Sequence, residues 1–314
     1  MLTRRHIRVK VLQSLYAFYQ SDEQDLDKQE KFLQFSINEI LDLQAVMLQL
    51  MVAIRDQAEK FLEKSQNKYF ASQVEKNPSR SFIENRVIKM ISENETLSIY
   101  IKNKKIAYWS EDDEYITLLF NELKQASWYT DYLEKESTSF ADDKELAIKL
   151  YKEIIAPNDK LYEYIEDKRL TWLDDFPLIN TAIVKMLNKL TEKKTSSIFN
   201  ANVFKDKDDK SYSLQLLRKV ILNDDSLSEI VDGKTPNWDT DRIADIDLII
   251  LKMGIVEFLH FPSIPIRVTI NEYLEISKEY STPKSSFFIN GILDKLVKEF
   301  SEEGKLNKIG RGLT

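Results

Sequence analysis

The first 232 residues of this 314-residue chain contain no glycine. All six glycines lie at position 233 or later, and the long glycine-free part is rich in Leu, Ile, Lys and Glu. Glycine weakens a helix, whereas Leu, Lys and Glu form helices readily. The pattern therefore predicts an all-α protein. Hydrophobic residues make up 43% of the chain, which is enough for a packed core in two domains or in one long array of helices.

The residue types needed for most catalytic and metal sites are scarce. Cysteine is absent, and His6 and His260 are the only histidines. Disulfides, thiolate metal sites and cysteine nucleophiles are thereby excluded, and a histidine-based metal site is not expected. The sequence also has no glycine-rich phosphate loop and no nucleophile elbow. We therefore expect a protein that is not an enzyme and carries no cofactor.

No run of eighteen apolar residues and no apolar N-terminal signal segment occurs in the sequence. This predicts a cytoplasmic protein without a membrane-spanning segment.

Basic residues gather at the N-terminus of an acidic chain. The net charge is −7, yet Arg4, Arg5, Arg8 and Lys10 all precede the first acid, Asp22. Such a cluster can neutralise phosphates and release counterions, which gives salt-sensitive binding to nucleic acid. It can equally be the solvated start of a helix, and the residues alone do not decide between the two.

A repeat runs through the second half of the chain. Residues 143–190 align without a gap on residues 209–256, and the identical pairs include Asp143 with Asp209 and Trp172 with Trp238. A fainter earlier copy places Trp109 on Trp172 after a slip of one residue. Each copy reads as an amphipathic helix, a polar break, a short helix, a Trp and a third, apolar helix. We interpret the recurring Trp as a core residue rather than a ligand-stacking one.

Segments at both ends carry recognisable helix motifs. Residues 265–280 read PIRVTINEYLEISKEY and residues 287–295 read FFINGILDK. These segments resemble the INEA-ELAK and FVNGVLDK helices of the NusB family of transcription antitermination factors. Near the N-terminus, Arg4-Arg5-His6, Arg8, Gln13 and the segment 14–18 resemble the family's first helix, with its arginines, Gln and ALY followed by an aromatic residue. The resemblance covers about residues 3–21 and 209–298.

The resemblance implies RNA binding. Family members bind boxA, a short single-stranded RNA element of ribosomal RNA leaders, together with NusE, a small-subunit ribosomal protein, within the RNA polymerase antitermination complex. RNA contacts are then expected from the basic and polar residues Arg4, Arg5, His6, Arg8, Lys10, Gln13 and Lys284. Tyr16 and Asp247 match family residues that face NusE, although Asp247 can also be read as an exposed acid on a helix flank.

Two further pairs in the C-terminal motifs are assigned to packing rather than to an active site. Asn271 is expected to bond backbone, and Glu272 to pair with a lysine or to cap a helix. Asn290-Gly291 is expected to mark a close helix crossing. A related fold forms the RNA-binding domain of some ribosomal RNA cytosine methyltransferases. Because the motif lies close to Thr314, no methyltransferase domain is expected after it.

The predicted architecture is all-α, an elongated stack of NusB-like helical bundles in three segments. Residues 1–65 form N-terminal helices with the basic arm, residues 66–205 an inserted region of repeat units, and residues 206–314 a C-terminal helical domain. Two functions stay open. The chain is either an antitermination factor that binds boxA-type RNA with NusE, or a helical protein-interaction scaffold of the same fold that has lost boxA recognition.

Overall fold

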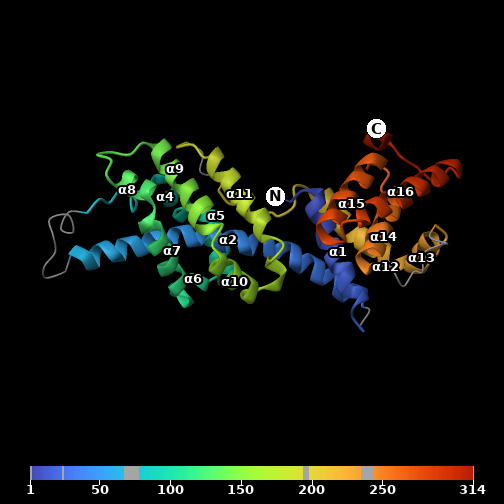
Figure 1. Cartoon of the computed structure of the whole chain (residues 1–314), viewed down its shortest axis with the longest axis horizontal. Coiled ribbons are helices and arrows are strands. Elements are labelled where there is room, and N and C mark those ends of the chain that lie inside the picture. The colour runs from blue at the N-terminus through green and yellow to red at the C-terminus, as the bar shows by residue number, and fades with distance from the viewer. Residues whose placement is uncertain (1, 23–24, 67–77, 194–197, 235–242, 314) are drawn as a thin grey trace. The chain divides into compact units, whose positions relative to one another are not determined.

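A computed structural model describes residues 2–22, 25–66, 78–193, 198–234 and 243–313. All regular elements assigned in these residues are helices, which confirms the predicted all-α class (Figure 1). The chain divides into two compact units: unit 1 comprises residues 1–37 and 204–314, and unit 2 residues 38–203. This division falls inside helix α2 (Leu26–Gln66), so α2 contributes residues to both units. The predicted segment boundary between residues 65 and 66 lies at the other end of that helix.

Unit 1 is built around α14 (Asp245–His260), a helix that is apolar on every side. Ile250, Leu251, Met253, Ile255 and Val256 are all fully buried. A helix that is hydrophobic all round must be covered on all its faces to be stable in water. In unit 1 the neighbouring helices are α1 (Arg4–Tyr19), α12 (Lys207–Leu222), α13 (Asp224–Asp232), α15 (Ile266–Tyr280) and α16 (Ser285–Glu302), with a short turn η4 (Gly310–Leu313) (Figure 1).

The close helix crossing of unit 1 occurs at Gly254, not at Gly291. A Cβ atom at Gly254 would lie 3.0 Å from Cδ2 of Leu293, so a larger residue there would press α14 away from α16. At Gly291 a Cβ would meet nothing within 4 Å. The expectation that Asn290-Gly291 marks the crossing is therefore wrong. Gly291 is exposed on α16, and Asn290 bonds along that helix to Asp294 at 3.0 Å.

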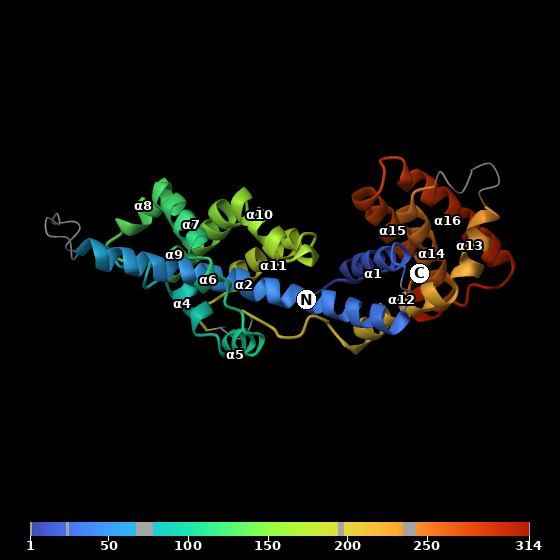
Figure 2. The same cartoon turned by 90° about the horizontal axis from the view of Figure 1, so that it is seen from below.

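Unit 2 contains two copies of the predicted repeat and confirms their internal order (Figure 2). The later copy consists of α9 (Phe140–Lys149) continued by the π-helical turn η1 (Leu150–Ile155), α10 (Asp159–Lys168), η2 (Leu170–Trp172) and α11 (Phe176–Lys189). The earlier copy consists of α4 (Arg86–Ser92), α5 (Glu95–Lys104), α6 (Tyr108–Glu111) and α7 (Asp113–Gln125), and α8 (Ser127–Leu133) follows it. Helices α12, α13 and α14 of unit 1 give the third copy, whose Trp238 lies outside the described residues.

The repeated tryptophans of unit 2 are core residues, as predicted. Trp172 and Trp109 are both buried. Nε1 of Trp172 donates to the backbone oxygen of Glu39 at 3.0 Å, and Nε1 of Trp109 donates to the backbone oxygen of Val46 at 2.7 Å. Both acceptors belong to α2 and lie seven residues apart, so each copy anchors its Trp two helical turns from the next.

The acids that the repeat alignment pairs also occupy equivalent positions. Asp143, near the start of α9, accepts from Nε of Arg86, the first residue of α4, at 2.6 Å. Asp209, near the start of α12, accepts from Nε of Arg4, the first residue of α1, at 3.0 Å. Both carboxylates are buried. Each unit therefore ties the start of one helix to the start of a neighbour with the same kind of ion pair.

One helix among the described residues, α2, is long and apolar enough to cross a membrane by length and composition. However, 72% of its most apolar stretch is buried inside the protein. The core helix of a helical bundle passes the same test, and the tryptophan contacts of α2 are those of a core helix.

Candidate nucleic-acid and partner interface

The first turn of α1 carries the predicted RNA-binding residues. Thr3 is the N-cap of α1, and its backbone N–H donates to Nδ1 of His6 at 3.1 Å. The hydroxyl of Thr3 lies 2.9 Å from the same nitrogen. The His6 ring therefore closes a capping box, which satisfies polar groups that a helix start otherwise leaves open. One edge of the imidazole is committed to the helix end.

Arg4 and Arg5 are half-exposed and held by carboxylates from distant helices. Nε of Arg4 donates to Asp209, and the same guanidinium lies over the ring of Tyr212, 5.1 Å from its centroid. Arg5 donates from Nε and from Nη2 to the two carboxylate oxygens of Glu272, both at 2.9 Å. Their side chains are 39% and 43% exposed. Because a guanidinium has five N–H donors, each arginine keeps donors beyond those used by its carboxylate.

The hydrogen bond to Glu272 raises the pKa of Arg5, so this group stays charged at every pH at which the protein is folded. Glu272 was expected to pair with a lysine or to cap a helix; it pairs instead with an arginine, Arg5.

Arg8 is a core residue. Its guanidinium is 2% exposed and forms a two-pronged bond with Glu257, from Nε at 2.7 Å and from Nη2 at 3.0 Å. The hydroxyls of Tyr212, Thr269 and Tyr273 also donate to this carboxylate. Burial alone would lower the pKa of Arg8, but the adjacent Glu257 carboxylate outweighs burial and the pKa is raised. Burial would likewise raise the pKa of Glu257, yet Arg8 and the hydroxyl donors lower it.

The structure therefore does not place the whole basic cluster on the surface. Arg8 and Lys10 are each 2% exposed, and Gln13 is half-buried. Arg8 and Lys10 lie too deep to reach a phosphate without leaving their sites. Gln13 is half-buried, as are Arg4, Arg5 and His6, so the part of the predicted α1 cluster that can meet RNA is reduced to these four residues.

The predicted partner residues lie toward the other end of α1. Tyr16 is 41% exposed and lies about 18 Å along the helix from Arg4, at about 1.5 Å per residue. One turn later, Nε2 of Gln20 donates to Asp245 at the start of α14, at 2.9 Å. The end of α1 and the start of α14 are thus joined, which brings Tyr16 and Asp247 to one end of unit 1.

Asp247 is buried, so its interpretation as an exposed acid on a helix flank is wrong. One carboxylate oxygen accepts from the hydroxyl of Ser285 at 2.6 Å. The other oxygen, Oδ1, has no hydrogen-bond partner among the described residues. An unpaired buried oxygen of this kind is costly.

Lys284 belongs to this second end of unit 1 and not to the arginines. It is exposed and immediately precedes Ser285, the first residue of α16 and the partner of Asp247. Phe287, in the next turn, is 81% exposed and was not predicted as a site residue. Its motif, FFINGILDK, suggested a packed helix, and only the position of the helix in the fold shows that this ring faces solvent.

Unit 1 is thus an all-α bundle in which a basic first helix packs on an apolar central helix. The NusB family model matches residues 177–298, which end within α16. The chain belongs to the NusB family.

Three relatives carry the name transcription antitermination protein NusB. The protein of Salinibacter ruber is 34% identical over 122 residues, which cover 39% of this chain and 76% of the relative. That of Chloroherpeton thalassium is 37% identical over 122 residues, 39% of this chain and 58% of the relative. That of Clostridium botulinum is 44% identical over 91 residues, 29% of this chain and 68% of the relative. No solved structure matches the chain significantly.

Proposed function

We propose that this chain is a transcription antitermination factor that binds boxA-type single-stranded RNA of ribosomal RNA leaders together with NusE. The observation that carries the proposal is that two arginines at the start of α1, Arg4 and Arg5, are half-exposed in a chain of the NusB family. The family match begins at residue 177, so the role of α1 rests on its local motif and on its geometry.

The ion pairs of Arg4 and Arg5 are compatible with RNA binding. Both carboxylates are largely buried, so a phosphate would share each arginine with its carboxylate rather than replace it, through the N–H donors that the carboxylate leaves open. A guanidinium held along one edge is also already oriented, which lowers the entropy lost when its other edge binds phosphate. Asp209 and Glu272 would then orient the side chains of Arg4 and Arg5 toward the RNA.

The proposed NusE contact lies at the Tyr16 end of unit 1. Tyr16 offers an exposed aromatic ring with a polar tip, a common anchor in protein interfaces. Asp247 is buried, so it would support this contact from inside unit 1, by holding Ser285 at the start of α16. Lys284, at the same end, could hold RNA that passes between the two proteins.

A second function is favoured by a specific observation: carboxylates within unit 1 neutralise all three arginines of α1. If these pairs persist when RNA is present, little positive charge is left for phosphate. The chain would then be a helical protein-interaction scaffold of the NusB fold without boxA recognition.

The test is the salt dependence of RNA binding. Fluorescence anisotropy of a labelled boxA-like RNA from the organism's own leader is recorded with the full chain, alone and with its NusE, at several salt concentrations. Each phosphate contact with single-stranded RNA contributes about 0.7 to the slope of log affinity against log salt. The double variant Arg4→Ala and Arg5→Ala should therefore lower the slope by about 1.4.

Arg218→Ala is the matched control. Arg218 belongs to the same unit and forms the same two-pronged pair, with Glu30 at 2.7 and 2.9 Å, but lies in α12. Its slope should equal that of the unchanged chain. RNA binding that NusE tightens and that keeps its slope in the double variant would reject the assignment of Arg4 and Arg5. Absence of RNA binding with and without NusE would favour the scaffold.

A further inference from the structure

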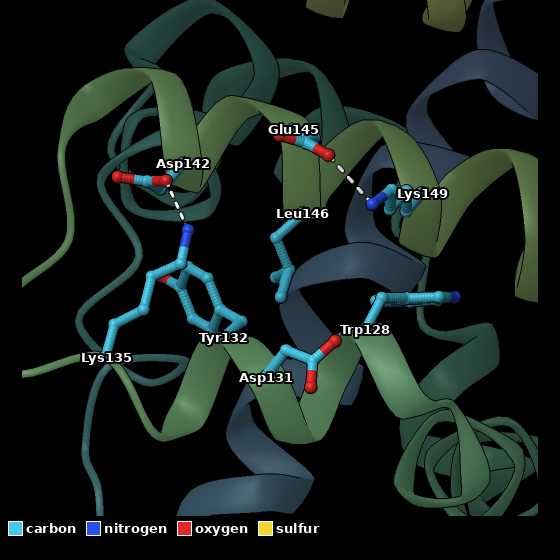
Figure 3. A pocket seen from close by; sticks show the side chains of 8 residues that line it. All are labelled: Trp128, Asp131, Tyr132, Lys135, Asp142, Glu145, Leu146 and Lys149. Carbon is cyan, nitrogen blue, oxygen red and sulfur yellow. Dashed lines mark hydrogen bonds and ion pairs between the residues drawn. The ribbon is translucent and has the colours of Figure 1, made fainter.

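Unit 2 contains a small open cavity between α8 and α9, away from every residue assigned above (Figure 3). Its volume is about 210 Å³. Trp128 and Asp131 face it from α8, and Glu145 and Leu146 from α9 (Figure 3). The site is below the range of roughly 300–1,000 Å³ that small-molecule pockets occupy, so it suits a single side chain better than a cofactor.

The floor and one wall of the cavity are apolar. Leu146 and the ring of Tyr132 are buried beneath it, and the Tyr132 hydroxyl turns into the core, where it donates to Asp143 at 2.8 Å. The indole of Trp128 is half-exposed at one side. An aliphatic stem could lie along these surfaces, and the indole face attracts a cation.

Two of the three carboxylates around the cavity form ion pairs with lysines, and the third does not. Lys135 pairs with Asp142, and Lys149 pairs with Glu145 at 2.8 Å. Both pairs are drawn in Figure 3. Asp131 has no hydrogen-bond or ion-pair partner among the described residues. The cavity therefore combines an aromatic face, an apolar floor and an unpaired anion.

We propose that this cavity docks an arginine side chain from a basic segment of a partner protein. A guanidinium stacks on an indole and binds a carboxylate with a planar edge, which an ammonium group cannot do. With Asp142 and Glu145 paired to lysines, Asp131 leaves the opening with one excess negative charge, which favours a cation over the phosphates of RNA. The surrounding unit is acidic as a whole, because residues 38–203 contain 28 acidic and 23 basic residues, so a basic protein is also attracted at long range.

This inference does not depend on RNA binding by unit 1. The probe is a capped peptide with two arginines flanked by glycines, titrated into the ¹⁵N-labelled full chain. The indole N–H signal of Trp128, identified by its loss in Trp128→Phe, should shift and saturate. A copy of the peptide with citrulline in place of arginine has the same shape without the charge, and should bind roughly fivefold more weakly.

Variants separate the cavity from general acidity. Asp131→Asn should lower the affinity of the chain for the arginine peptide roughly fivefold. Asp167→Asn removes an exposed acid of α10 outside the cavity and should leave the affinity unchanged. Asp131 is exposed and unbonded, so its change should not disturb folding.

Equal affinity of the arginine and citrulline peptides would overturn the proposal. So would equal effects of the two Asp→Asn changes, or a titration in which the Trp128 signal does not move. A Trp128 shift with single-stranded RNA and none with the peptide would also reject a protein segment as the occupant.

Discussion

At the scale of single residues, the arginines of α1 show what charge patterns in a sequence leave out. Arg4, Arg5 and Arg8 are all visible as basic residues, but their partners Asp209, Glu272 and Glu257 lie more than 200 positions away. Nothing local distinguishes Arg8, which is buried, from Arg5, which is half-open. The location of the cluster could be predicted from the sequence, whereas the accessibility of each member depends on the tertiary fold.

Glu257 should be among the residues most important for the stability of unit 1. Glu257→Gln would remove the closer of the two carboxylates beside the buried guanidinium of Arg8 and leave that of Glu272, 3.6 Å from Nη1; breaking a buried pair typically costs about 3–5 kcal/mol. The free energy of unfolding, measured with urea and circular dichroism, should fall by that amount. Glu275→Gln, at an exposed acid of α15 paired with the exposed Lys278, should change it by less than about 0.5 kcal/mol. Similar losses in both variants would contradict the role given to the buried pair.

At the scale of helices, the repeat was the most predictable feature of the chain. The helix order, the polar breaks and the burial of Trp109 and Trp172 follow from residue spacing and are confirmed. The close contact at Gly254 was not predicted. Gly254 and Gly291 are both helical glycines, and only the fold shows that Gly254 faces a neighbouring helix while Gly291 faces solvent. The acceptor of each Trp could not be predicted either, since Val46 and Glu39 act through backbone oxygens that leave no sequence signal.

The Trp172 anchor on α2 can be tested by removing its donor. Trp172→Phe deletes the bond to the Glu39 oxygen and leaves a small void, so unfolding free energy should fall by roughly 1–3 kcal/mol. Far-UV circular dichroism in urea is suitable because it does not depend on tryptophan emission. Trp128→Phe, at a half-exposed ring, is the matched control and should cost less than about 1 kcal/mol. An unchanged free energy of unfolding in Trp172→Phe would show that the bond of Trp172 to α2 does not stabilise the fold.

At the scale of the whole molecule, two compact units share one chain and differ in their relation to the family. Helices α12 to α15 lie within the family match, which ends inside α16, whereas α4 to α10 lie outside it. The length and repeat made the presence of extra helical units predictable. The division of α2 between the units was not, because its apolar pattern continues without a break from Leu33 to Ile54.

Unit 2 should lose stability between mildly acidic and neutral pH. Burial and the neighbouring Asp42 carboxylate raise the pKa of Glu39 from 4.5 to about 7, despite the Arg169 guanidinium at 2.7 Å. The folded state then holds a proton that the unfolded state releases. Stability from this group is present below about pH 4.5 and falls by at most about 1.4 kcal/mol per pH unit as pH rises toward 7.

Glu39→Gln removes the titration while keeping a donor toward Asp42. Urea unfolding followed by tryptophan emission reports mainly on unit 2, which holds three of the four tryptophans. Between pH 5 and pH 7 the variant should lose less stability than the unchanged chain. Parallel pH profiles of the two proteins would show that Glu39 titrates normally.

The backbone oxygens of α2 that accept from the two tryptophans, those of Glu39 and Val46, lie seven residues apart. This interval limits how further repeats can be added to such a chain. Seven residues advance a helix by about 10.5 Å, close to the 8–10 Å between packed helices. One more copy of the repeat would therefore need two more turns of α2 to receive its tryptophan. Duplicating the repeat alone would leave the tryptophan of the new copy without a backbone oxygen of α2 to bind. The length of α2 and the number of repeats therefore have to evolve together.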